Sequence, residues 1–419
     1  MVQRRIVCNF APRKINSRVE AGTSSLVPEK HGSPADPYRI FFPLGIFLGI
    51  AGVSIWPLYY WGVSSSYSGR SHAFVQTDCF LYAFIAGFLW TAIPKFTGTT
   101  GPSRAIQYFL ASLLVVQMIA FELQYFALGH LLFILAHATF IAVVVRCFIR
   151  RQHPPPETFV FVGLGLFAGM VGAIINAGIA FQVTSPELDL LGKRLLTEGM
   201  VLLLVLGVGG FLGPRLLGFA QLPNFQNLEK LSGKVKPPRT VVLRREIYAT
   251  AGFLILISVV AEYGLKLPNL AWLRATIATT VILMNIRPWR KPVTRTTLAW
   301  CVWTAHWLLI VALWLVVAAP RYRIDFLHVM FIGGFTLLIL AVGTRVVLSH
   351  GGHGLTEESR SWPLRIGLVT GIIAMFARIG APFSPESYFG HLAWAAELWI
   401  VGMGFWGFYL LRRINSTGH

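Results

Sequence analysis

The chain has 419 residues, of which 55% are hydrophobic and only 13% are charged, and its formal net charge is +19. Soluble domains carry about 25% charged residues, so this chain has too few charged side chains to cover a soluble globule. The composition therefore excludes a soluble protein and predicts an integral membrane protein.

Twelve apolar stretches follow one another along the chain, separated by short basic or proline-containing breaks. Apolar runs of about 18 residues or more are typical of transmembrane helices. The expected spans are 41–62, 73–93, 105–122, 128–149, 157–182, 191–213, 246–264, 269–286, 296–319, 326–348, 363–381 and 391–411. The sequence predicts an all-α fold, a polytopic transmembrane bundle of about twelve helices.

The expected spans divide the chain into five parts. Residues 1–40 are polar and basic without the apolar core of a secretory signal, and they are expected to form a disordered cytoplasmic tail. Helices one to six occupy residues 41–213 and helices seven to twelve occupy 246–411. Between these halves, the basic segment 214–245 is expected to be a cytoplasmic loop, and residues 412–419 a cytoplasmic tail.

Lysine and arginine residues lie mainly in the breaks on one side of the predicted membrane, which include both ends of the chain. Positively charged loops stay in the cytoplasm, so both termini are expected there. Because the basic residues are spread over loops and do not gather on one folded face, nucleic-acid binding is excluded.

Helices two, six and ten share a cluster of small residues near their predicted cytoplasmic ends, at Ala86-Gly87, Gly209-Gly210 and Ala341 to Gly343. His72 precedes Gly87 by the interval that separates His328 from Gly343, about four helical turns. A threefold array of four-helix units would explain the pattern. Small residues that allow close helix packing would explain it equally well.

Histidines inside predicted membrane helices are candidate ligands, because imidazole commonly binds haem iron and copper between the helices of a bundle. Four of them open their helices from the predicted outer face, which favours a shared site there. The other interpretation is that each one hydrogen-bonds a headgroup or a neighbouring carbonyl. The candidate ligands are His72, His130, His137, His306, His328, His350 and His391.

Carboxylates and arginines also occur within the predicted spans, where charged groups are costly and therefore functional candidates. They either pair with one another or serve in proton delivery and in binding anionic groups such as haem propionates. The candidates for a proton path are Glu122, Glu262 and Glu397, and those for acid or propionate pairing are Arg274, Arg345 and Arg378.

Several motifs resemble those of the NnrS family over nearly the whole chain. His72-Ala73 with Ala86-Gly87-Phe88-Leu89 to Pro94 and Thr97-Gly98 resembles that family's second helix, roughly HAHE…AGFLLTAVPNWTG. The opening Pro37-Tyr38-Arg39-Ile40-Phe41-Phe42 is similar to its PFRPFF start, and Leu327-His328 through His350-Gly351 to its LH…SR…LGHTG helix. Gly209-Gly210 with Pro214, and Arg378 with Leu398-Trp399, add to the resemblance.

The resemblance implies a multi-pass protein of the bacterial inner membrane that contains haem and copper and takes part in nitric oxide response or denitrification-linked metabolism. Its partners would be the lipid bilayer and nitric oxide or another small diatomic molecule. The positions that match the family motifs as possible ligands are His72, His328 and His350. Phe74 and Val75 stand where the family pattern has a second histidine and a glutamate, so copper is expected to bind weakly or not at all.

Two other functions remain open at this point. Twelve spans and a central loop are also typical of secondary transporters, which need no metal. A respiratory haem–copper reductase would need closely spaced histidines on one helix, and only His130 and His137 come near that pattern. In the haem-binding interpretation, His72 and His328 are expected to approach each other near the outer surface, with Arg378 beside them.

Overall fold

The computed structural model describes residues 36–220, 239–351, 358 and 361–414, and these residues form helices and no strand. Eleven helices are long and apolar enough to cross a membrane. A shorter apolar helix, α11 (Leu270–Ile286), completes the expected twelve. The prediction of an all-α transmembrane bundle is confirmed. Residues 1–35, 221–238 and 415–419, parts of the expected tails and central loop, lie outside the described residues.

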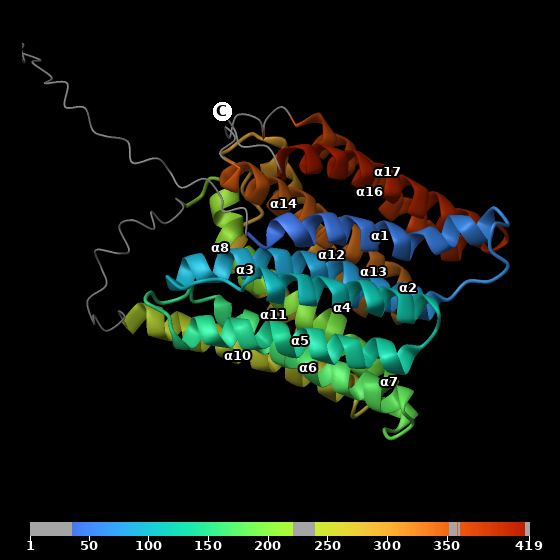
Figure 1. Cartoon of the computed structure of the whole chain (residues 1–419), viewed down its shortest axis with the longest axis horizontal. Helices are drawn as coiled ribbons and strands as arrows, with labels where there is room; N and C mark the ends of the chain where they lie inside the picture. The colour runs from blue at the N-terminus through green and yellow to red at the C-terminus, as the bar shows by residue number, and fades with distance from the viewer. Residues whose placement is uncertain (1–35, 221–238, 352–357, 359–360, 415–419) are drawn as a thin grey trace, which may run out of the picture.

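Twelve helical columns run side by side in the described part of the chain (Figure 1). The first four are α1 (Tyr38–Tyr60), α2–η1–α3 (Gly69–Phe74, Val75–Leu81, Tyr82–Thr97), α4 (Arg104–Glu122) and α5 (Phe126–Ile149). The next four are α6 (Phe159–Ala180), α7–η3–α8 (Asp189–Arg194, Leu195–Val201, Leu202–Leu216), α10 (Arg239–Tyr263) and α11. The last four are α12 (Thr297–Ala318), α13–η5–α14 (Arg323–His328, Val329–Thr336, Leu337–His350), α16 (Trp362–Gly380) and α17 (Tyr388–Ile414). Short 3₁₀ turns, η2 (Pro186–Leu188), η4 (Pro320–Tyr322), η6 (Ala381–Phe383) and η7 (Pro385–Ser387), lie in three of the connections.

Helix packing groups the columns into three units of four. In each unit the first helix packs against the second, and the third and fourth form a hairpin. The units join in a ring, because α5 packs on α6, α11 on α12, and α17 closes back onto α1. The threefold array, one of the two interpretations of the small-residue pattern, is therefore the arrangement of the helices. The central loop between the two expected six-helix halves connects the second and third helices of the second unit.

The second helix of every unit contains a π-helical segment: η1, η3 and η5. Such segments widen the helix by one residue per turn, and they are rare and frequently found at functional sites. Thr77 in η1 and Thr197 in η3 each hydrogen-bond the carbonyl four residues earlier, at 2.9 and 3.2 Å. An acidic residue follows each threonine, Asp78 and Glu198 respectively. The interruption of these helices is thus a repeated feature of the fold.

Units one and two share a set of identical residues at an offset of 120 positions. Glycines at these positions let the first helix approach the second helical column closely. A Cβ atom at Gly49 would lie 2.6 Å from Phe80, and one at Gly172 would lie 2.8 Å from the carbonyl oxygen of Gly192. The matched pairs are Gly45 and Gly165, Gly49 and Gly169, Gly52 and Gly172, Thr77 and Thr197, Gly87 and Gly207, Pro94 and Pro214, and Gly98 and Gly218. Gly98 and Gly218 also share a positive φ, 68° and 80°, at the ends of α3 and α8.

The two ends of the bundle differ in the residues that they present. We call the end with α2, α7 and α13 (right in Figure 1) the outer end and the opposite one the inner end, after the orientation that the charges predict. At the inner end the guanidinium of Arg39, in the first turn of α1, donates to the carbonyl oxygen of Ile414, the last residue of α17. This contact lies where the ring of units closes.

Candidate functional site

His72 and His328, from the first and third units, lie at the outer end of the bundle. His72 in α2 bonds through Nδ1 to the carbonyl oxygen of Gly52 at 2.7 Å, and its ring packs edge-on against Trp56. His328 at the end of α13 bonds through Nδ1 to the carbonyl oxygen of Ile324, also at 2.7 Å. A carbonyl oxygen only accepts, so Nδ1 carries the hydrogen in both rings and Nε2 keeps its lone pair. Metal-binding histidines are commonly fixed in this way.

Arg378 is a cation whose charge acts on both histidines. His72 and His328 lie within electrostatic range of each other, and both are also within range of Arg378. The Nη1 atom of Arg378 in α16 lies 2.7 Å from Oδ1 of Asp325 in α13. We call His72, His328 and Arg378 the outer histidine site. That these three residues form one binding site stays a prediction.

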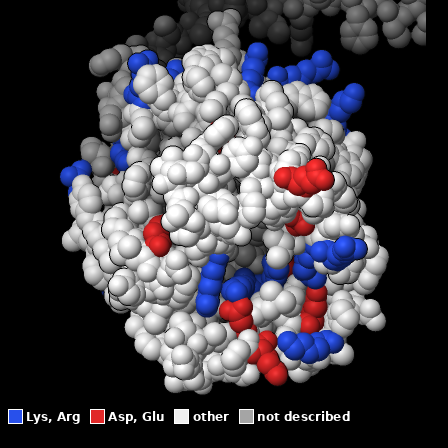
Figure 2. Space-filling view, turned by 90° about the vertical axis from the view of Figure 1, so that its right-hand side faces the viewer, with Lys and Arg blue, Asp and Glu red and all other residues white. Residues whose placement is uncertain are grey.

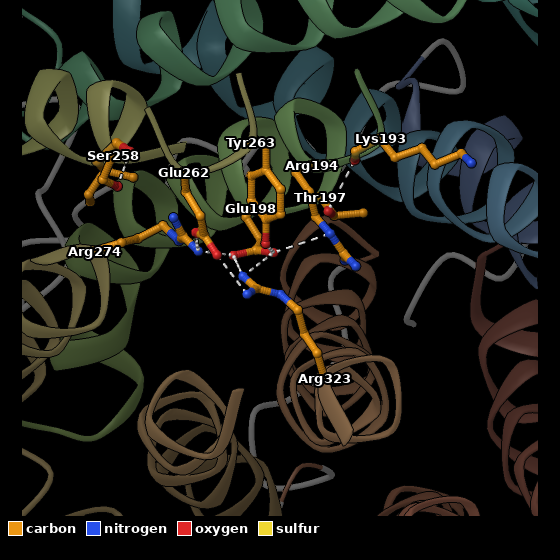
Figure 3. A network of polar contacts seen from close by, with 10 residues as sticks. Lys193, Arg194, Thr197, Glu198, Ser258, Glu262, Tyr263, Arg274 and Arg323 are labelled. Atoms are coloured by element: carbon orange, nitrogen blue, oxygen red, sulfur yellow. Dashed lines mark hydrogen bonds and ion pairs between the residues drawn. The ribbon is translucent and has the colours of Figure 1, made fainter. Parts of the chain in front are cut away.

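A second group of charges lies between the second and third units (Figure 3). Arg274 in α11 and Arg323 in α13 point toward Glu198 in η3 and Glu262 in α10. Nη2 of Arg274 lies 2.7 Å from Glu198 and 2.6 Å from Glu262, and Nη1 of Arg323 lies 2.7 Å from Glu262. Arg194 also pairs with Glu198, at 3.6 Å. We call these five residues the ion-pair cluster: Arg194, Glu198, Glu262, Arg274 and Arg323. Arg274 pairs with acids in it, which is one of the two interpretations given for the arginines in the sequence analysis.

Figure 2 looks onto the outer end, where acidic and basic side chains gather in one interleaved patch while much of that face is uncharged. Ion pairs at this end include Arg70 with Asp189, at 3.8 Å, and Lys193 with the same carboxylate. Arg70 lies in the first turn of α2 and Asp189 begins α7, while Lys193 lies in the last turn of α7. The pair of Arg70 with Asp189 connects the second helices of units one and two at this end.

A cavity of about 120 Å³ lies in the middle of the ring. Its walls come from α3, α8 and α14, the second helices of the three units, together with part of α12. His306 in α12 is the one ionisable side chain among its lining residues. Nδ1 of His306 bonds to the carbonyl oxygen of Val302 at 2.6 Å, which again leaves the lone pair on Nε2.

His130 and His137 have opposite environments, although both are fully buried in α5. Both ring nitrogens of His137 are engaged, by the hydroxyl of Tyr82 and by the carbonyl oxygen of Leu166, each at 2.9 Å. His137 is thus a hydrogen-bonded core histidine with no free nitrogen for a metal. Neither nitrogen of His130 has a hydrogen-bond partner in the described chain, and the ring packs edge-on against Phe74 with centroids 4.5 Å apart.

The two remaining candidate histidines, His350 and His391, each bond a backbone carbonyl through Nδ1. His350 at the inner end bonds through Nδ1 to Val346, its buried Nε2 has no partner among the described residues, and its ring lies 5.6 Å from that of Tyr38. His391 at the outer end bonds through Nδ1 to the carbonyl oxygen of Ala377 at 3.1 Å. Across the described residues, no three His, Cys, Asp or Glu side chains come close enough together to hold a metal ion.

The expected proton-path carboxylates occupy three different environments. Glu262 belongs to the ion-pair cluster. Glu397 accepts a hydrogen bond from the indole of Trp61 at 2.6 Å, and Glu122 is exposed at the end of α4. Arg345, at the inner end of α14, pairs with Glu358.

Four buried acids, Asp78, Glu198, Asp325 and Glu358, were missed by the sequence analysis. The sequence did contain a signal for two of them. Asp78 is the one carboxylate in the expected span 73–93, and Glu198 is the one in 191–213. Acids within the membrane are functional candidates. Asp325 lies one residue before its expected span, 326–348, so only the structure reveals that its side chain is buried.

Comparison with known protein families shows to which family the chain belongs. The NnrS protein family model matches residues 34–414, from just before α1 to the end of α17. The chain belongs to the NnrS family. No curated protein matches it. The resemblance found in the sequence is confirmed, and all twelve columns of the ring are part of the NnrS match.

Proposed function

We propose that this NnrS-family protein binds haem at the outer histidine site and serves in nitric oxide response or denitrification-linked metabolism in the bacterial inner membrane. The observation that carries the proposal is the matching hydrogen-bond state of the His72 and His328 rings. They come from helices far apart in the chain, and each has its Nδ1–H fixed by a backbone carbonyl and its Nε2 lone pair left over.

The donor set fits haem iron, for which neutral imidazole nitrogen is a common axial ligand. His72 and His328 would hold the iron, and haem would supply redox chemistry and affinity for a small diatomic molecule. Trp56, packed on His72, provides an aromatic surface beside the ligand. Arg378 provides a cation at the same place, held by Asp325, and guanidinium groups pair well with carboxylates such as propionates.

Copper has less support than haem. Phe74 occupies the position of the second motif histidine and packs against His130, while Val75 is fully buried. Neither side chain donates to a metal, so a copper site on α2 would retain only His72 of the motif. We therefore propose weak or absent copper binding in this chain.

The visible absorption spectrum of the detergent-purified protein tests the proposal. A Soret band is expected in the wild type, and it should be lost or shifted in His72→Ala and in His328→Ala. His391→Ala is the matched control, because His391 lies at the same end and also bonds a backbone carbonyl through Nδ1. An unchanged Soret band in both single variants would overturn the outer histidine site as the haem site.

A transporter function is the second candidate. Interrupted helices around a central cavity are typical of secondary transporters, and η1, η3 and η5 interrupt the three helices that surround the cavity. A purified protein without a Soret band would favour this candidate.

A further inference from the structure

We infer that the central cavity is a binding site for a small uncharged molecule that has an apolar body and one hydrogen-bond donor, and that His306 accepts the hydrogen bond. This site is separate from the outer histidine site and does not depend on haem. The inference combines the position of the cavity, the chemistry of its walls and the state of the His306 ring.

The cavity walls are built from side chains that the three units leave uncovered. Ile85, Val205, Val208, Ile339 and Val342 each face the middle of the ring, and none of them is fully buried although they lie inside a helix bundle. Apolar cavities of roughly this size, about 150 Å³ in an engineered case, stay dry and bind benzene or xenon. The space in this protein, about 120 Å³, therefore suits a ligand of a few heavy atoms to about the size of one aromatic ring.

The charge of the ligand follows from the lining. No Asp, Glu, Lys or Arg is among the residues that line this cavity in the described chain. A charged ligand would lose its hydration without gaining an opposite charge, which is costly in an apolar surrounding. The site therefore selects uncharged molecules.

His306 supplies the one polar recognition element. Its side chain is 2% exposed, and Nε2 has no hydrogen-bond partner in the part of the chain described. The Nε2 edge of the ring faces α8 at Gly209, where an added Cβ would lie 3.2 Å from Nε2. The glycine thus leaves room beside the nitrogen. Because Nδ1 donates to Val302, Nε2 is an acceptor, and it suits a ligand O–H or N–H group.

A matched pair of probes separates the apolar contribution from the hydrogen bond. Fluorobenzene has the apolar body alone, and 4-fluorophenol adds one hydroxyl donor. Binding of each to the full-length protein in detergent is followed by ¹⁹F NMR, which separates a protein-bound signal from probe dissolved in micelles. Both probes are expected to give a bound signal with the wild-type protein.

Substitution of His306 by leucine tests the hydrogen bond at nearly constant side-chain volume. His306→Leu should weaken 4-fluorophenol binding about tenfold, as expected for the loss of one hydrogen bond, and change fluorobenzene binding less than about twofold. Equal effects on the two probes would overturn the role of His306. Loss of a haem Soret band in His306→Leu would also overturn it, because the cavity would then belong to the haem site.

Filling the cavity tests its location. Val208→Trp should abolish the bound signal of both probes, because Val208 lines the cavity. Val311→Trp is the control, since Val311 lies on α12 with 42% of its surface exposed on the outside of the bundle, and it should leave both signals unchanged. A bound signal that persists in Val208→Trp would overturn the site. Co-purified lipid that neither probe displaces would identify an acyl chain as the occupant and also overturn it.

Discussion

Nη2 of Arg274 lies 2.7 Å from a carboxylate oxygen of Glu198, and both side chains are almost fully buried, at 2 and 3% exposure. The two residues come from α11 and from the π-helical segment η3. Glu262 and Arg323 complete the pairing, so the cluster connects the second unit to the first helical turn of α13 in the third. The charges are thus compensated inside the bundle and fix the position of η3.

Arg274→Met should lower the free energy of unfolding by about 3–5 kcal/mol, because removing one member of a buried ion pair leaves the others uncompensated. Thermal or SDS-induced unfolding of the detergent-purified protein measures the change. Lys193→Met is the control, since Lys193 pairs with Asp189 near the surface, where an ion pair contributes at most about 1 kcal/mol. Similar losses in the two variants would show that the ion-pair cluster has no special structural role.

Phe74→His should create a metal site together with His130. The two rings are 4.5 Å apart at their centroids, and both nitrogens of His130 lack partners among the described residues. We expect copper, measured by elemental analysis of purified protein, to rise from substoichiometric in the wild type toward one per chain. Phe133→His is the control, because Phe133 stacks on His137, whose two nitrogens are already bonded. Stoichiometric copper in the wild type would contradict this prediction.

Gly172→Ala should destabilise the second unit by about 1–3 kcal/mol, the usual effect of overpacking. The added methyl group would lie 2.8 Å from the carbonyl oxygen of Gly192, a backbone atom that cannot rotate away. Gly163→Ala on the same helix meets open space and should be neutral or slightly stabilising. Unfolding in detergent compares the two, and a neutral Gly172→Ala would argue against close packing of α6 on α7.

Both termini and the connection between α8 and α10 are expected to lie in the cytoplasm. A reporter that is active only outside the cytoplasm should therefore be inactive when inserted at Lys230 and active when inserted at Ser185, in the connection at the opposite end. The reverse pattern would place the outer histidine site on the cytoplasmic side of the membrane.

The sequence predicted the number, type and approximate limits of the helices, because a membrane-spanning helix is specified locally by its own apolar length. It also selected His72, His328 and Arg378 for the outer histidine site, through their depth and motif positions. It did not specify which helices are neighbours, since apolar faces that meet lipid and apolar faces that meet helices have the same composition.

The π-helical segments were not predicted for a related reason. Thr77-Asp78 and Thr197-Glu198 have no strong local preference for a wider helix, and the segments become visible only in the hydrogen-bond pattern of the folded backbone. The 120-residue offset was present in the sequence, in glycines such as Gly49 and Gly169. It was overlooked because small residues are frequent in all membrane helices.

The closure of α17 onto α1 has a consequence for how the protein is made. Helix α1 leaves the ribosome before α17, so the surface that it offers to α17 stays uncovered until α17 has been synthesised. During that time this surface faces lipid, other proteins or the insertion machinery. The bond from Arg39 to the carbonyl oxygen of Ile414 can form only after α17 has left the ribosome, so this contact belongs to a late step of assembly.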